Sequence, residues 1–246
     1  MKQTRIMMDM PITIEIVDAT ATNEIIDQVY EYFTYIDTTF SPFKENSEVS
    51  RINRGILGKE EYSSDMKIIL ALAEQTKQET QGFFDVHQNG KLDPSGIVKG
   101  WAINNAAKIV EQAGFSSYYV DAGGDIQVLG TNREGNPWKI GIRHPFEKDK
   151  IVKTLAVTNH GIATSGTYLR GQHIYNPKNP KQKITGIVSL TVIGPNIYEA
   201  DRFATAAFAM ERQGIQFIEQ LSGFEGYMID KEGKATYTSG FEKYVI

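Results

Sequence analysis

The chain of 246 residues contains no cysteine and no long apolar run. The lack of cysteine excludes disulfide bonds, zinc–thiolate sites, thiol nucleophiles and a lipid-modified cysteine anchor. The apolar runs, such as the one from Gly186 to Ile193, are far shorter than the roughly 18 residues that a membrane-spanning helix needs. We therefore expect a protein without a membrane span.

Clusters of lysine and arginine are also lacking. The chain carries 26 Lys and Arg residues against 30 Asp and Glu residues, which gives a formal net charge of -4. Proteins that bind nucleic acids usually show a basic patch, so we expect no nucleic-acid partner. The segment 1–10 does not resemble a secretory signal peptide, because Asp9 interrupts the apolar stretch 6–8. As written, the sequence predicts a cytoplasmic protein; an extracytoplasmic protein trimmed of its leader would look the same.

Three common catalytic motifs are missing as well: the Gly-x-Ser-x-Gly elbow, the Walker loop and the His-Glu-x-x-His zinc motif. What remains is an ordinary globular composition, with 41% hydrophobic and 23% charged residues, in a chain long enough to bury a sizeable core. No repeat, low-complexity tract or long linker divides it. We therefore expect a single domain over residues 1–246.

Hydrophobic periodicity predicts helices and strands that come in separate blocks. Helical spacing of apolar residues predicts helices over 21–38, 64–80, 99–113, 197–210 and 214–221. Alternation or short apolar runs predict strands over 12–16, 118–120, 126–129, 138–142, 187–193 and 226–230. Because strands follow one another through short, turn-rich links, we expect an α+β fold with mixed or antiparallel sheets and flanking helices.

The stretch from Leu92 to Ala102 is the most informative part of the sequence. It places an acid, Asp93, and a cation, Lys99, immediately before the apolar-periodic segment that begins at Trp101. The free N–H groups and positive dipole of a helix start, together with a cation, make an anion site. The pattern therefore predicts that Lys99 and the helix start bind a phosphorylated ligand.

Asp201 and Thr205 are four residues apart, so they share one face of the predicted helix over 197–210. Both offer hard oxygen ligands, which suit Mg²⁺ or Ca²⁺ better than a soft transition metal. The alternative is an acid that interacts with the helix dipole and a threonine on the surface. The spacing alone leaves both interpretations open.

Two turn-like segments and one histidine are further candidates. The glycines of the segment 121–125 lie between two predicted strands, where they could form a phosphate cradle or a tight hairpin. The segment 164–166 forms a hydroxyl-rich turn that could hold a ligand or only itself. His173, just before Asn176 and Pro177, is the candidate general base, with a structural role as the alternative.

These segments occur in an order that is more specific than any one of them. The segment 40–53 is similar to S-x-Y-x-x-x-S-E-x-S-R-x-N, and the segment 82–85 to G-A-F-D, two motifs of the ApbE-type flavin transferases. Further along follow the family's L-D-x-x-x-x-K-G-x-A (92–102), N-A-G-G-D (121–125), T-S-G (164–166), H-I-x-x-P (173–177) and A-D-x-x-A-T-A (200–206). The sequence therefore resembles this family from about Met8 to Met210.

The resemblance implies an α+β fold that binds FAD and Mg²⁺. Members cleave the pyrophosphate of FAD and pass its FMN half to a Thr or Ser hydroxyl of an acceptor protein, a protein flavinylation that releases AMP. By the same resemblance, the metal ligands are the carbonyl of Gly96 and the side chains of Asp201 and Thr205. Asp201 is thus a catalytic residue, and His173 would activate the acceptor hydroxyl.

Phe43 occupies the position of the family's ring-stacking tyrosine. We expect the cofactor-binding residues to be Met8, Phe43, Ser47, Glu48, Phe83, Phe84, Asp85, Asp93, Lys99, Gly123, Gly124, Thr164, Ser165 and Gly166.

The sequence departs from the family pattern at three places. The family's M-G-T is Met8-Asp9-Met10 here, and one expected acid of its H-I-x-D-P is Asn176. Only the residues 87–91, roughly, stand where the family has several dozen residues between G-A-F-D and L-D. These departures keep two alternatives open: an FAD pyrophosphatase, in which water replaces the acceptor, and a non-catalytic FAD-binding protein.

Overall fold

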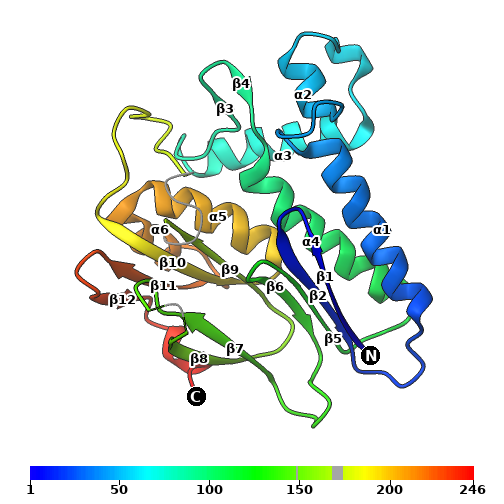
Figure 1. Ribbon diagram of the computed structural model, residues 1–246. Coiled ribbons are helices and arrows are strands. Elements are labelled where there is room, and N and C mark those ends of the chain that lie inside the picture. Colours follow the sequence, from blue (N-terminus) through cyan, green and yellow to red (C-terminus); the bar gives the residue numbers. More distant parts are fainter. Residues whose placement is uncertain (148, 168–173) are drawn as a thin grey trace.

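The computed structural model describes residues 1–147, 149–167 and 174–246 (Figure 1). Its main sheet contains the strands β1 (Lys2–Met7), β2 (Met10–Ile16), β5 (Tyr118–Ala122), β6 (Asp125–Leu129), β9 (Gly161–Gly166), β10 (Ile187–Gly194), β11 (Glu225–Asp230) and β12 (Ala235–Tyr237). These eight strands pair in the order β1-β2-β5-β6-β9-β10-β11-β12, and each neighbouring pair is antiparallel.

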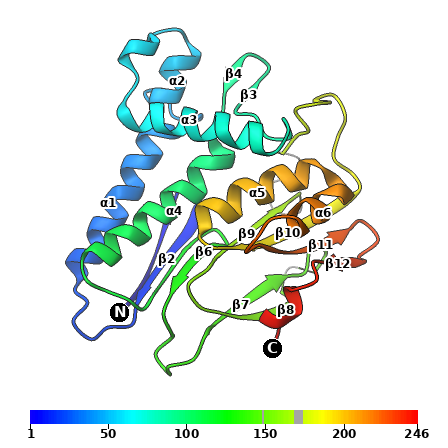
Figure 2. The same ribbon diagram turned by 180° about the vertical axis from the view of Figure 1, so that it is seen from behind.

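Helices lie on one side of this sheet. They are α1 (Asn23–Phe40), α2 (Glu48–Asn53), α3 (Ser64–Glu79), α4 (Ser95–Gln112), α5 (Ile197–Ala209) and α6 (Gly214–Glu219), with short 3-10 helices at Lys59–Glu61 and Glu211–Gln213. A third 3-10 helix, Phe241–Tyr244, packs on the other side, with the β7–β8 hairpin. Two hairpins complete the fold: β3 (His87–Gln88) with β4 (Lys91–Leu92), and β7 (Trp138–Arg143) with β8 (Ile151–Val157). Figure 2 shows α3 running across one end of α4 and past α5.

The sheet is covered on both faces, so it has two apolar layers. One layer packs α1, α4 and α5 against the sheet and contains the buried isoleucines of β2, Ile12, Ile14 and Ile16. The other lies between the sheet and the β7–β8 hairpin, where Trp138 and Ile140 are buried (Figures 1 and 2). The α+β fold with antiparallel strands and flanking helices is confirmed.

Some strands and one helix were not predicted. β1 is an edge strand whose residues are mostly exposed, so it lacks the alternation that marked β2. β8 pairs with β7, yet only Leu155 and Val157 of its residues are buried. α2 has six residues, too few to show a helical period.

Two predicted elements need correction. The helix expected from Lys99 begins at Ser95, so Lys99 lies in its second turn and not beside the free N–H groups of the first. The segment 164–166 is not a turn but the end of β9, where Thr164 and Ser165 pair with Thr191 and Leu190 of β10. No helix of the described residues is both long and apolar enough to cross a membrane.

Candidate functional site

The helices α4 and α5 touch at a glycine. The N–H of Gly100 donates to Oδ2 of Asp201 over 2.8 Å, and Asp201 is buried, with 4% of its surface exposed. A Cβ added at Gly100 would lie 2.6 Å from Cβ of Asp201 and 2.9 Å from the carbonyl oxygen of Ile197. Only glycine therefore lets the two backbones approach closely enough for this hydrogen bond.

Gly96 and Thr205 meet one helical turn further along the same seam. A Cβ at Gly96 would lie 3.3 Å from Cγ2 of Thr205, and 3.4 Å from the ring of Phe84. The structure thus brings together the three predicted metal ligands, Gly96, Asp201 and Thr205, although they come from two helices more than a hundred residues apart.

The chemistry of these three groups fits a hard cation. They offer a carboxylate, a hydroxyl and a backbone carbonyl, which are the oxygen ligands that Mg²⁺ accepts. In a regular helix the carbonyl of Gly96 would accept from the N–H of Gly100, and here that N–H donates to Oδ2 of Asp201. The described residues contain no cluster of three or more His, Cys, Asp and Glu side chains that could hold a metal.

Lys99 is held by an acid from the sheet. Its Nζ forms an ion pair with Oδ2 of Asp125, the first residue of β6, whose side chain is 3% exposed. The other oxygen of Asp125 accepts from the N–H of Thr164 over 2.9 Å. Sequence analysis assigned no role to Asp125; its place at the end of the N-A-G-G-D-like segment was the available signal. Asp125 therefore fixes both the side chain of Lys99 and the end of β9.

The glycine pair of the segment 121–125 makes a tight hairpin between β5 and β6. Gly123 and Gly124 both have positive φ, 66° and 99°, and the N–H of Gly124 donates to Asp121 over 2.7 Å. Burial raises the pKa of Asp121, although the bonds from Gly124 and Tyr119 oppose this shift. Of the two interpretations of this segment, a phosphate cradle or a tight hairpin, the structure shows the hairpin.

A pocket of about 270 Å³ lies beside this turn. Three predicted cofactor residues, Gly123, Gly124 and Thr164, line it together with Lys139 and Arg143 of β7. Both basic side chains point away from the apolar layer, because β7 buries Trp138, Ile140 and Ile142 on its other face. Gly166 and the buried Ser165 lie on β9 and do not line this pocket.

The strip Phe83–Asp85 follows α3 and lies against α4. Phe84 is buried and contacts the Gly96 region, whereas Phe83 is half-buried. Asp85 accepts from Nζ of Lys77 over 2.7 Å and from the N–H of His87 over 2.8 Å. Burial by itself would raise the pKa of Asp85, but these two bonds and the charge of Lys77 lower it.

Three predicted cofactor residues lie between α1 and the start of α2: one is an exposed ring, and two make structural hydrogen bonds. Phe43 is 92% exposed, as a ring that stacks on a ligand needs to be. Ser47 is buried and caps α2: its hydroxyl accepts from the N–H of Ser50 and donates to the carbonyl of Ser41. Glu48 accepts from the N–H of Ser63, which caps α3. The contacts of Ser47 and Glu48 explain local folding, and their predicted role at the cofactor stays a prediction.

Met8 and Asp9 form the turn between β1 and β2, both with positive φ, 50° and 57°. Such angles strain residues other than glycine, and Asp9 stands where the family has glycine. The turn lies beside the glycine hairpin, since the N–H of Gly123 donates to the carbonyl of Pro11 over 3.0 Å.

Asp93 is exposed and accepts from both the N–H and the hydroxyl of Ser95, so it orders the first turn of α4. The candidate base His173 lies outside the described residues.

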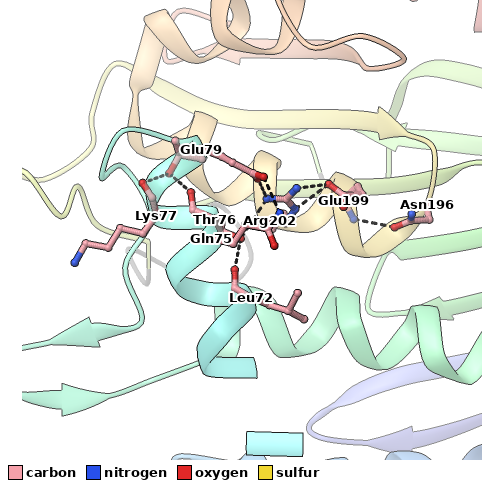
Figure 3. A network of polar contacts seen from close by, with 9 residues as sticks. Leu72, Gln75, Thr76, Lys77, Glu79, Asn196, Glu199 and Arg202 are labelled. Carbon is pink, nitrogen blue, oxygen red and sulfur yellow. Dashed lines mark hydrogen bonds and ion pairs between the residues drawn. The ribbon is translucent and has the colours of Figure 1, made fainter. Parts of the chain in front are cut away.

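Arg202 is a residue that sequence reasoning missed. It is buried beside Asp201 and forms ion pairs with Glu79 of α3 and Glu199 of α5 (Figure 3). Its guanidinium also lies 3.9 Å from the ring centre of Phe203. A charged residue in an apolar helix was the available signal, but its partner on α3 is 123 residues away in sequence. This network ties α5 to α3.

The sequence model of the ApbE family matches residues 8–90 and 86–228, and the chain belongs to this family. A protein named FAD:protein FMN transferase from Escherichia coli (strain K12) is 33% identical over 156 residues, which cover 60% of this chain and 44% of that protein. A protein of the same name from Vibrio cholerae is 32% identical over 138 residues, 52% of this chain and 41% of that one. The matched segment thus spans less than half of these relatives.

Solved structures share the fold over nearly the whole chain. The flavin transferase ApbE from Vibrio cholerae superimposes with a TM-score of 0.85 at 21% identity, covering 99% of this chain and 98% of that one. The ApbE protein from Thermotoga maritima gives a TM-score of 0.87 at 20% identity, with coverage of 99% and 98%. The architecture is therefore that of the ApbE flavin transferases.

Proposed function

We propose that this protein is a Mg²⁺-dependent FAD:protein FMN transferase, which moves FMN from FAD to a Thr or Ser hydroxyl of an acceptor protein and releases AMP. The proposal rests above all on the seam between α4 and α5, where Gly96, Asp201 and Thr205 meet. Family membership and the names of the relatives support the same activity. The proposal covers the whole of residues 1–246 as one catalytic domain.

The transfer exchanges one phosphorus–oxygen bond for another. The acceptor hydroxyl attacks the phosphorus on the FMN side, the bond from that phosphorus to the bridging oxygen breaks, and AMP leaves with the bridging oxygen. The hydroxyl proton passes to a base, for which we nominate His173. A Mg²⁺ ion, when bound, would neutralise charge on the phosphate oxygens.

Different residues of the chain would contribute to these steps. Asp201 contributes the negative charge of the seam, and the N–H of Gly100 fixes the direction of its carboxylate. Lys99, oriented by Asp125, adds a positive charge one turn from Gly96, where a pyrophosphate would be held. Phe43 presents an open ring face to the isoalloxazine.

The proposal is tested by incubating the protein with FAD, Mg²⁺ and a peptide that carries a Ser/Thr-Gly-Ala-Thr segment, followed by mass spectrometry. We expect AMP together with a peptide heavier by one FMN. The variant Asp201→Asn should lose turnover by at least about a hundredfold, because it removes the charge from the seam. Asp230→Asn is the matched control, since Asp230 is also buried but contacts the turn after β11 and Arg212 rather than the seam.

Other products would point to the other hypotheses. AMP with free FMN, formed at the same rate without peptide, would make the protein an FAD pyrophosphatase. If FAD binds but stays intact with every Thr- or Ser-containing peptide, the protein is a non-catalytic FAD-binding protein. Equal turnover by Asp201→Asn and Asp230→Asn would refute the role of the seam.

A further inference from the structure

The segment 174–178 lies across the strip Phe83–Asp85 and the adjoining His87, although about ninety residues separate them in sequence. The hydroxyl of Tyr175 donates to two backbone carbonyls, those of Asp85 at 3.0 Å and His87 at 3.1 Å. Nζ of Lys178 lies 4.1 Å from the ring centre of Phe83. Two side chains of one segment therefore hold both ends of the strip.

The strip is fixed from its other side as well. The carboxylate of Asp85 accepts from Lys77 of α3, while its backbone carbonyl accepts from Tyr175. Phe84 is 3% exposed and packs beside Gly96. These contacts of Tyr175 and Lys178, which we call the clamp, thus connect the segment 174–178 with α3 and with the α4–α5 seam.

The hydroxyl of Tyr175 is protonated at neutral pH, as a phenol with its ordinary pKa would also be. Burial raises the pKa of Tyr175 to about 12, and the charges of Asp85 and Asp93 add to this shift. The phenol can donate to the carbonyls near neutral pH. Its acidic neighbours are themselves predicted cofactor residues, so the hydroxyl lies within the predicted flavin site.

Two residues of these contacts lie at positions that the family motifs leave open or fill differently. In the motif H-I-x-x-P, the residue Tyr175 occupies a variable position, and Phe83 stands where G-A-F-D has alanine. The carbonyl of His87 begins the β3–β4 hairpin, which stands where the family has several dozen residues. The clamp therefore anchors the shortened part of the molecule.

We propose that Tyr175 and Lys178 are positioning residues, which hold the strip Phe83–Asp85 in the conformation that receives FAD. The inference rests on the proposed function, since it assigns the strip to the flavin nucleotide. Tyr175 acts through the backbone of Asp85 and His87, and Lys178 acts through the ring of Phe83.

The test measures FAD affinity directly, by the change in flavin fluorescence on titration with the protein in the absence of an acceptor. Tyr175→Phe removes only a hydroxyl and is expected to raise the Kd for FAD about fivefold, as the loss of one hydrogen bond predicts. In the transfer assay, KM for FAD should rise by the same factor while kcat stays within about twofold.

Tyr30→Phe is a closely matched control. The hydroxyl of Tyr30 also donates to two carbonyls, those of Gln3 at 3.0 Å and Ile12 at 3.1 Å, but away from the strip. We expect this variant to lose thermal stability to a similar extent as Tyr175→Phe and to keep the Kd of the unaltered protein.

Lys178 is tested by its own pair of variants. Lys178→Gln should weaken FAD binding about threefold, and Lys178→Arg should restore it, because arginine keeps the cation over the ring. In a Phe83→Leu background, Lys178→Gln should have no further effect.

The possible outcomes separate this inference from the proposed function. If the unaltered protein binds FAD and Tyr175→Phe binds it within about twofold as well, the clamp is only structural and the inference is overturned. If the unaltered protein does not bind FAD at all, the proposed function fails and the inference fails with it. An effect of Lys178→Gln that persists in the Phe83→Leu background would overturn the role of Lys178 alone.

Discussion

Replacing Arg202 by methionine is expected to lower the free energy of unfolding by about 3 kcal/mol. The side chain of Arg202 is 5% exposed, and its guanidinium is held by Glu79, Glu199 and the hydroxyl of Thr76, which lies 3.3 Å from Nη1 (Figure 3). Methionine would keep much of the contact with the ring of Phe203 but would leave both carboxylates without their cation.

The magnitude follows from how far each partner is exposed. Breaking a fully buried ion pair costs about 3–5 kcal/mol, chiefly because one charge stays buried and alone. Here the side chains of Glu79 and Glu199 are 38% and 25% exposed, so water can solvate the carboxylates that remain. This partial solvation places the expected loss at the lower end of the range.

The assay is urea unfolding at pH 7, followed by circular dichroism, with the m-value compared between variants. Glu79→Gln should cost about 1 kcal/mol, because its charge is more exposed than that of Arg202. Adding Glu199→Gln to Arg202→Met should recover part of the loss, since one unpaired charge is removed. A loss below about 1 kcal/mol for Arg202→Met, or strict additivity in the double variant, would refute the reasoning.

Three further predictions concern the seam, an acid and a turn. Gly100→Ala should destabilise by about 2 kcal/mol despite the better helix propensity of alanine, because its Cβ would meet Asp201, and chemical denaturation measures this loss. The pKa of Asp85 is lowered, because the effect of burial is outweighed by Lys77 and a backbone hydrogen bond. The folded state therefore gains stability from this carboxylate above about pH 4 and loses it as the pH falls further. The difference in unfolding free energy between the unaltered protein and Lys77→Met should shrink as the pH falls below about 4. Asp9→Gly should raise stability by about 0.5 kcal/mol by relieving the positive φ, whereas Asp9→Asn should not; a comparison of their melting temperatures decides between strain and charge.

The parts of the site that sequence could predict are those that depend on one element. Asp201 and Thr205 were placed on one helical face because a helix fixes the relation of residues four apart. The approach of Gly96 could not be derived in this way, since it depends on how α4 packs against α5. Its assignment came from the family resemblance and stays a prediction, although Gly96 and Thr205 do lie next to each other.

The missed contacts share one physical cause, a large separation in sequence. The partners of Arg202 on α3 and the bond from Tyr175 to Asp85 join residues that are 123 and 90 positions apart. Periodicity reports which face of an element is buried, but it carries no information about which polar side chain will face it. The polar edge strand β1 was missed for a related reason, because its place is fixed by pairing with β2 and not by burial.

The neighbouring positions 201 and 202 show how the fold fixes the candidate metal seam. Consecutive residues of an α-helix point about 100° apart, so Asp201 and Arg202 face different neighbours. Asp201 accepts from Gly100 of α4, and Arg202 binds Glu79 of α3. A rotation of α5 about its axis that relaxed one contact would break the other. The carboxylate of Asp201 is therefore aimed by two polar contacts on different sides of one helix, which is the rigidity that a site with few protein ligands requires.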